Sequence, residues 1–93
     1  MRIEPRPSYR RDLKKRGLNP VERQVLADFL HDLREDADLV ERYGEHELMD
    51  DWAGYLECHL DGDWLVIYKR FSDRIVLYRT GTHADLFDRY LRR

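Results

Sequence analysis

Histidine, aspartate and arginine side chains recur near the ends of predicted strands in the second half of this 93-residue chain. They are His59, Asp63, Arg79 and His83, and a further histidine, His46, lies in the acidic segment before them. Histidine can accept or donate a proton near neutral pH, because its unperturbed pKa is about 6.5. Arginine offers phosphate a fixed fork of donors. Such a set suits metal-free RNA cleavage, which needs a base for the ribose 2'-hydroxyl, an acid for the leaving 5'-oxygen and a cation for the phosphorane.

Each of these residues also has a plain structural role open to it. By default His46 is exposed in an acidic loop, His59 is half-buried in a strand, and Asp63 completes a turn. Arg79 can pair with an acid across the sheet, and His83 can cap the segment that follows it. Taken singly, the five residues favour structure over chemistry, so the chemistry depends on whether folding brings them together.

Length and composition indicate one small domain spanning residues 1-93. The single cysteine, Cys58, excludes an internal disulfide and a cysteine-rich metal site, and the sequence calls for no metal or cofactor. No apolar run approaches the roughly 20 residues of a membrane span, and the first residues lack the apolar core of a secretory signal. We therefore expect a cytoplasmic protein with no membrane partner.

The net charge of -2 hides three blocks of opposite sign. Residues 1–23 carry a balance of +5, residues 24–63 a balance of -11, and residues 64–93 a balance of +4. On charge alone, the simplest interpretation is that acidic segments solvate the surface. If folding brings the two basic ends together, they form a positive groove for a polyanion.

The chain begins with a pattern typical of a short strand at residues 2–6 followed by a basic helix. Ser8 is the candidate N-cap of this helix, and Gly17 is the residue that ends it. Pro5 and Pro7 restrict the strand to the edge of a sheet, because proline cannot donate a ladder hydrogen bond.

A longer helix is predicted to follow, capped by Asn19, with Pro20 at its first position and Glu22 three residues after the cap. Its apolar residues have the spacing of one buried face: Val21, Val25, Leu26, Phe29, Leu30 and Leu33. Residues 36–53 lose this period and are expected to form a connecting loop with at most one helical turn.

From residue 54 onward the pattern is that of three antiparallel strands, at residues 54–60, 63–71 and 74–81. Asp61-Gly62 is a strong hairpin signal between the first two. The middle strand is apolar on both faces, as expected of a central strand. The predicted class is therefore α+β, with N-terminal helices packed on a small antiparallel sheet in two layers.

Alternation along the first of these strands places Tyr55, Glu57 and His59 on one face. The same parity in the last strand groups Leu77 with Arg79. The polar strand ends His59 and Arg79 can therefore face the same side of the sheet.

The stretch HELMDDWAGYLECHLDGDWLVIYKRFSDRIVLYRTGTHADLF, residues 46–87, resembles the C-terminal half of the YafQ-type toxins of the RelE/ParE superfamily. The resemblance rests on the spacing of two histidines, Trp-x-Gly-Tyr, Asp-Trp, Ile-Tyr-Lys, and Arg-Thr-Gly-Thr-His followed by Leu-Phe. It implies a RelE/ParE-like two-layer fold and the activity of a bacterial type II toxin-antitoxin ribonuclease. Such toxins cleave messenger RNA in the ribosomal A site without a metal cofactor, leaving a 2',3'-cyclic phosphate.

The resemblance also implies the site residues and the partners. The residues are His46, His59, Asp63, Arg79, His83 and Phe87. His83 would be the general acid and Arg79 the phosphate contact, while His59 and Asp63 would position or deprotonate the 2'-hydroxyl. His46 would support this network and Phe87 would stack a base. The implied partners are a DinJ/RelB-like antitoxin, the ribosome and mRNA, with DNA bound only through the antitoxin.

Two other functions compete with this one. A ParE-like toxin would grip a protein such as DNA gyrase without cleaving RNA, although the several histidines argue against it. A zinc hydrolase would use His46, His59, Asp63 and His83 as ligands, but their spacing lacks a short two-ligand motif.

Overall fold

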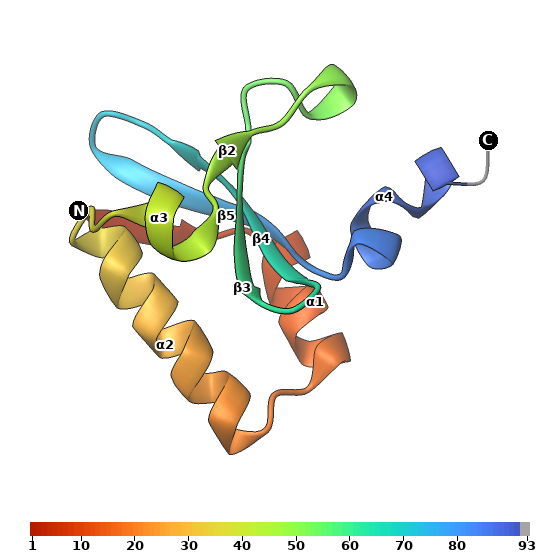
Figure 1. The fold of residues 1–93 in the computed structure, drawn as a ribbon, viewed down its shortest axis with the longest axis horizontal. Helices are drawn as coiled ribbons and strands as arrows, with labels where there is room; N and C mark the ends of the chain where they lie inside the picture. The colour runs from red at the N-terminus through yellow and green to blue at the C-terminus, as the bar shows by residue number, and fades with distance from the viewer. Residues whose placement is uncertain (92–93) are drawn as a thin grey trace.

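The computed structural model describes the backbone of residues 1–91 and the side chains of residues 1–87 (Figure 1). Its elements are β1 (Arg2–Pro5), α1 (Pro7–Arg16), α2 (Pro20–Arg34), α3 (Leu39–Tyr43), β2 (His46–Glu47), the 3-10 helix η1 (Asp50–Trp52), β3 (Leu56–Asp61), β4 (Trp64–Arg70), β5 (Arg74–Gly81) and α4 (His83–Leu91). The predicted α+β class is confirmed. None of the helices in the described part is long and apolar enough to cross a membrane.

The sheet is larger than predicted and is mixed rather than purely antiparallel. Its strand order is β1-β5-β4-β3-β2, and β1 pairs with β5 in parallel while the other pairs are antiparallel. The segment expected to be a loop supplies β2, because His46 and Glu47 pair with β3. Pro5 closes β1 at the outer edge of the sheet, as its missing N–H requires.

The second helix begins as the sequence predicts. Asn19 Oδ1 accepts the Glu22 N–H at 2.8 Å, and Glu22 Oε1 accepts the Asn19 N–H at 3.2 Å, which completes the capping box. The predicted apolar face is wrong at Val21, which is 71% exposed. Val21 lies in the first turn of α2, ahead of the turns that pack on the sheet with Leu26, Phe29 and Leu33.

The first helix is anchored by a long-range contact rather than by the predicted cap. Arg6, not Ser8, occupies the N-cap position, and no side chain caps the helix there. The Ser8 hydroxyl instead donates to the Tyr78 carbonyl at 2.6 Å, which fixes the start of α1 against β5. Gly17 ends the helix as predicted, and its N–H donates to the Leu13 carbonyl.

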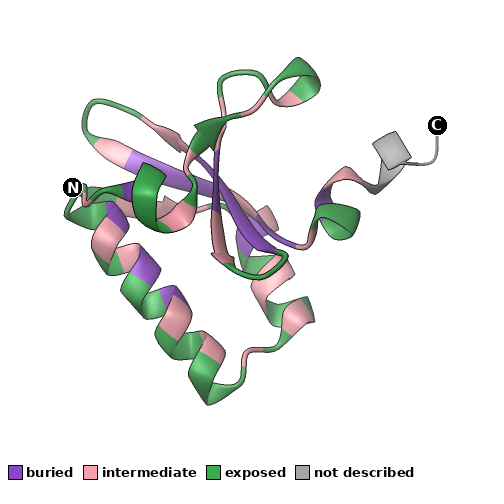
Figure 2. Cartoon of the chain, viewed as in Figure 1, coloured by how far each residue is buried: buried purple, intermediate pink, exposed green. Residues whose placement is uncertain are grey.

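Two hydrophobic clusters lie on opposite faces of the sheet. The larger one packs α1, α2 and α3 on residues that include Cys58, Trp64 and Tyr68. The smaller one holds Leu65, Ile67 and Leu86, with Leu48, Trp52, Tyr55 and Phe87 packed against it. We call the side that carries the smaller cluster the α4 face. Figure 1 shows α2 and α4 on opposite sides of the sheet, and Figure 2 shows buried residues along β4, β5 and the sheet side of α2.

The end of the basic helix α1 lies near the start of α4. The last turn of α1 carries Lys14, Lys15 and Arg16. The pKa of Asp85 in α4 is lowered mainly by hydrogen bonds from Thr82, and also by the charges of Lys15 and Arg16. The basic end of α1 is therefore close to the turn that precedes α4.

Candidate active site

The turn after β5 places His83 at the first position of α4. Gly81 has a φ of +156°, and a Cβ there would lie 3.1 Å from Asp85 Oδ2, so this turn requires glycine. Thr82 then caps the helix, because its Oγ1 accepts the Asp85 N–H at 3.1 Å while its own N–H donates to Asp85 Oδ2 at 3.1 Å. The chain thus leaves the sheet and returns His83 over the α4 face.

Asp63 holds His83 through two contacts. It lies in the hairpin between β3 and β4, and its Oδ1 is 2.5 Å from His83 Nδ1 and 3.3 Å from the His83 backbone nitrogen. These hydrogen bonds lower the pKa of the Asp63 carboxyl, which is therefore ionised at neutral pH. A carboxylate beside Nδ1 keeps the proton on that nitrogen, and Nε2 is left for the rest of the site.

The carboxylate of Glu57 is buried among His46, His59 and His83. Glu57 is only 2% exposed. Glu57 Oε1 is 3.4 Å from His59 Nε2 and 3.5 Å from His83 Nε2, while Oε2 is 3.4 Å from His46 Nε2. Oε1 has no hydrogen-bond partner among the described residues. A buried acceptor of this kind is costly unless a donor completes it, and the nearest donor atoms are His59 Nε2 and His83 Nε2.

Four rings follow one another across the α4 face. His46 stacks on His59 with ring centroids 6.1 Å apart, and His59 lies 5.6 Å from His83. Phe87 follows at 6.0 Å from His83. The three imidazoles and one benzene ring therefore form a continuous row beside the Glu57 carboxylate.

Arg79 stands in the same row of the sheet as Glu57. Register pairs His46 with Glu57, Glu57 with Ile67, and Ile67 with Arg79, which puts all four on one face, so Arg79 lies on the side of His59 as predicted. The predicted grouping of Leu77 with Arg79 is wrong, because a register shift after Ile67 pairs Leu77 with Tyr68, and both lie in the larger cluster on the other face. The Arg79 guanidinium turns to α1, where the Asp12 carboxylate binds it at 2.7 Å and 3.1 Å. This pairing is the main cause of the raised pKa of Arg79.

The structure brings five of the six expected residues into one continuous arrangement: His46, His59, Asp63, His83 and Phe87. Arg79 shares their face but is held at the sheet edge by Asp12. Two further residues of the site, Glu57 and Asp12, were not expected. The sequence contained a signal for Glu57, because alternation placed this acid on the same strand face as His59. The sequence contained no signal for Asp12, because its partner Arg79 is 67 residues away.

The cluster also has the composition of a metal site. Glu57, His59 and His83 each offer one ligand atom, and these atoms lie within 4.8 Å of one another. Imidazole nitrogen and carboxylate oxygen are ligands that zinc and copper accept. The zinc-site alternative from the sequence included Asp63, which binds His83 instead.

Solved structures that share this fold include bacterial toxins. A copper-bound mutant toxin from Helicobacter pylori matches with a TM-score of 0.80 at 27% identity, over 94% of this chain and 99% of that chain. YafQ in the Escherichia coli DinJ-YafQ complex matches with a TM-score of 0.76 at 32% identity, over the same 94% and 99%. The fold is that of a small toxin of a bacterial toxin-antitoxin system.

The family can be stated more closely. The model of the family described as the bacterial toxin of type II toxin-antitoxin system, YafQ, matches residues 1–88. This chain belongs to the YafQ family. It is similar to the mRNA interferase toxin YafQ of Escherichia coli K12, with 44% identity over 45 residues, 48% of this chain and 49% of that protein. The alignment thus spans about half the length of this curated relative.

Proposed function

We propose that this protein is a ribosome-dependent endoribonuclease that cleaves messenger RNA by attack of a ribose 2'-hydroxyl. The observation that carries the proposal is the placement of His59 and His83 on either side of one buried oxygen, Glu57 Oε1. Such a site can take a proton at one point and supply one nearby. The name of the Escherichia coli relative, an mRNA interferase, supports the same reaction class.

The reaction follows from this arrangement in one displacement. The Glu57–His59 pair takes the proton of the 2'-hydroxyl, and the 2'-oxygen attacks the adjacent phosphorus. The bond from phosphorus to the 5'-oxygen breaks, and His83 gives that oxygen a proton from Nε2. The products are a 2',3'-cyclic phosphate and a 5'-hydroxyl. Asp63 orients the His83 ring through Nδ1 and stabilises its charged form.

The remaining residues bind the substrate around this centre. Arg79 contacts the phosphate, using the donors of its guanidinium that Asp12 does not occupy. Phe87 stacks a base, because its ring continues the row of imidazoles. His46, on the other side of Glu57, supports the proton network.

We propose that cleavage needs no metal ion, since two histidines and a carboxylate already supply the proton transfers. A metal bound by Glu57, His59 and His83 would occupy the groups that move protons. The copper-bound state of the Helicobacter pylori toxin makes this point worth testing directly. Protein stripped of bound metal before the assay should cleave in the translation system with Mg²⁺ for the ribosomes and no added zinc or copper, and a strict requirement for added zinc or copper would contradict this part of the proposal.

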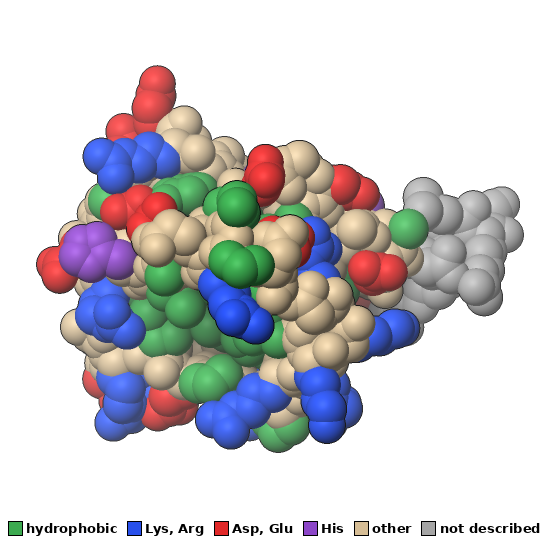
Figure 3. Space-filling view, turned by 90° about the horizontal axis from the view of Figure 1, so that it is seen from below, with side chains coloured by type: hydrophobic (Ala, Val, Ile, Leu, Met, Phe, Trp, Pro, Cys, Tyr) green, Lys and Arg blue, Asp and Glu red, His purple; other side chains and the backbone are tan. Residues whose placement is uncertain are grey.

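The proposed partner is a small antitoxin of the DinJ/RelB kind. The Escherichia coli DinJ-YafQ complex supports this proposal by its name. Figure 3 shows a face where Lys and Arg side chains surround a hydrophobic area, a surface that suits an acidic amphipathic segment. DNA would be bound only through the antitoxin. We propose the ribosome and mRNA as the other partners. The reaction would then take place in the cytoplasm.

The decisive experiment maps the 5' ends of a defined mRNA in a reconstituted translation system, with and without ribosomes. We expect wild-type protein to cut at fixed codon positions only when ribosomes are present. His83→Ala should abolish the cuts, while His31→Ala, on the exposed side of α2, should leave them. A fully active His83→Ala variant would overturn the proposal. Intact RNA together with blocked DNA supercoiling would favour the gyrase-binding alternative, which family membership does not favour.

A further inference from the structure

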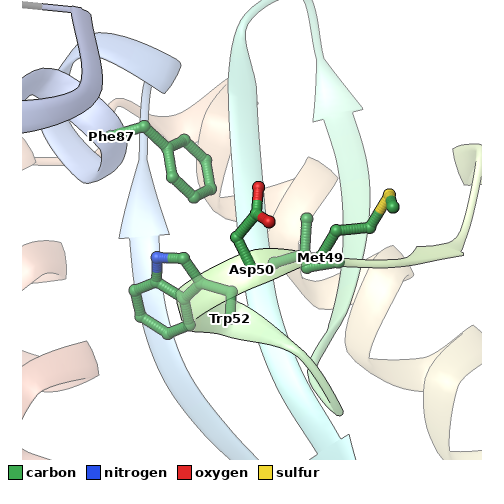
Figure 4. Close-up of a pocket in the computed structure, with 5 residues that line it drawn as sticks. Met49, Asp50, Trp52 and Phe87 are labelled. Carbon is green, nitrogen blue, oxygen red and sulfur yellow. The ribbon is translucent and has the colours of Figure 1, made fainter. Parts of the chain in front are cut away.

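A pocket of about 240 Å³ opens on the α4 face next to the row of rings (Figure 4). Its lining residues are Leu48, Met49, Asp50, Trp52 and Phe87. Trp52 and Phe87 meet edge to face, with ring centroids 6.2 Å apart and an interplanar angle of 81°. The two rings are therefore perpendicular neighbours, and a flat ligand that stacks on one of them would meet the other at its edge.

Phe87 connects this pocket to the candidate active site. Its ring lies 6.0 Å from that of His83 on one side and 6.2 Å from that of Trp52 on the other. A base stacked on Phe87 from the pocket side is thus within one nucleotide of a phosphate held beside His83. Phe87 is also the point where α4 is kinked, with a φ of -122°, and its side chain lines the pocket.

Asp50 supplies a carboxylate at this pocket. Its φ is +56°, a conformation that is uncommon for residues with a side chain and that aspartate and asparagine adopt most readily. Figure 4 shows its carboxylate directed up beside the Phe87 ring. No side chain among residues 1–87 forms a hydrogen bond or ion pair with it. The pocket therefore combines aromatic surface with an exposed hydrogen-bond acceptor, which suits a planar ligand that carries hydrogen-bond donors.

The chemistry of the pocket selects among flat ligands. An ionised carboxylate only accepts hydrogen bonds, and its two oxygens can accept two parallel ones. The Watson–Crick edge of guanine presents two adjacent donors, N1–H and the N2 amino group. Adenine and cytosine present one amino donor beside an acceptor nitrogen, and uracil presents one N–H between two carbonyl oxygens. The negative charge of Asp50 also repels phosphate, which keeps the RNA backbone out of the pocket.

We propose that the pocket lined by Trp52, Phe87 and Asp50 binds a guanine base of the RNA substrate next to the bond that is cut, and that the Asp50 carboxylate accepts hydrogen bonds from N1–H and the N2 amino group. This inference rests on the proposed function, because it names the base that the same site prefers. Phe87 supplies stacking and Trp52 an edge contact, which every base can use, and Asp50 supplies the discrimination.

The test compares cleavage of mRNAs that differ only in the base next to the cut. For wild-type protein we expect guanine to be preferred over the other bases by about tenfold to a hundredfold, the range for a good bidentate contact. Asp50→Asn should lose this preference, and asparagine tolerates positive φ, so the turn is retained. Asp51→Asn removes the same charge from the next residue, which does not line the pocket, and should keep the preference. Equal cutting beside all four bases, or an unchanged preference in Asp50→Asn, would overturn the inference while leaving RNA cleavage intact.

A second measurement does not depend on cleavage. The chain has two tryptophans: Trp52 lines the pocket, and Trp64 is only 1% exposed. A ligand that quenches tryptophan fluorescence therefore acts on Trp52, because Trp64 is shielded from it. GMP should quench wild-type protein at a lower concentration than AMP, CMP or UMP, and Asp50→Asn should remove the difference. If the protein cuts no RNA but this selectivity is present, the proposed function fails and the pocket inference stands. Identical titrations with all four nucleotides would overturn the inference.

Discussion

The guanidinium of Arg79 is bound by the Asp12 carboxylate through two nitrogens, Nε at 2.7 Å and Nη2 at 3.1 Å. The same carboxylate accepts the backbone N–H of Thr80 at 3.0 Å. Three hydrogen bonds from one side chain therefore fasten α1 to the end of β5. The guanidinium is fixed in position by the pair, while Nη1 lies outside it and can donate to a phosphate.

Asp12→Asn should weaken the fold by about 1 kcal/mol, because an amide cannot accept all three bonds and both partners are only partly exposed. Urea denaturation at neutral pH measures this loss as a lower midpoint. Asp28→Asn makes the same change on the exposed side of α2 and should alter stability by no more than about 0.5 kcal/mol. Equal midpoints for Asp12→Asn and wild type would show that the pair contributes nothing to folding.

Glu57→Gln should separate activity from stability. The amide keeps the shape of the side chain but cannot take a proton, so cleavage should fall by about a hundredfold or more. Removing a buried charge that has no fully paired cation should leave the free energy of unfolding unchanged or raise it. Single-turnover cleavage and thermal unfolding measure the two effects.

Two variants control this prediction. Glu47→Gln changes the exposed acid of β2 and should cleave RNA like wild type. Glu57→Asp retains the carboxylate and should recover part of the activity lost in Glu57→Gln. Equal activity of Glu57→Gln and wild type would remove Glu57 from the proposed mechanism.

The Asp63–His83 pair should make stability depend on pH in a defined direction. Hydrogen bonds from His83 lower the pKa of Asp63 below its ordinary value of 3.8. A carboxyl group whose pKa is lower in the folded state stabilises the fold above the unfolded pKa, and this contribution is lost as pH falls through the folded value. Asp63→Asn should therefore unfold at a lower temperature than wild type above about pH 4, and the two proteins should converge in stronger acid.

The matched control for this series is Asp61→Asn, which removes an exposed carboxylate from the same hairpin and leaves the contact between Asp63 and His83 in place. It should not reproduce the convergence expected of Asp63→Asn. Thermal unfolding midpoints between about pH 2 and pH 7 give the comparison. An Asp63→Asn curve parallel to that of wild type would contradict the prediction.

Gly81→Ala should displace the start of α4. The added Cβ would lie 3.1 Å from Asp85 Oδ2 and 3.2 Å from Asp85 Cβ, at a φ of +156°. We expect a loss of about 1–3 kcal/mol in stability, together with reduced cleavage because His83 moves with the helix. Gly62→Ala also places alanine at positive φ but meets no atom within 4 Å, so it should cost less and spare cleavage. A smaller effect at Gly81 than at Gly62 would contradict this account of the turn.

The sequence predicted those parts of the fold that depend on neighbours along the chain. The capping box of Asn19, the end of α1 at Gly17 and the hairpin at Gly62 each depend on three or four consecutive residues. Ser8 was assigned wrongly because its partner, the Tyr78 carbonyl, is 70 residues away. Val21 was assigned wrongly because helical spacing cannot tell how far along a helix its packing extends.

The same distinction holds within the candidate site. Residue type and the family resemblance selected the histidines, and alternation placed Glu57 on the face of His59. That Glu57 becomes the buried centre depends on β2 and α4 arriving from outside the hairpin. The hold of Asp12 on Arg79 depends on α1 lying beside β5, and no local pattern encodes that packing.

The parallel pairing of β1 with β5 has a consequence for how the protein is made. Arg2 of β1 pairs with Arg74 of β5, so β1 cannot pair in the sheet until β5 has been synthesised. Contacts this distant in sequence form late, because the intervening chain must first be produced and ordered. His83 and Phe87 lie on α4, which follows β5 in the chain. A growing chain on its own ribosome therefore lacks a complete site until α4 has been made.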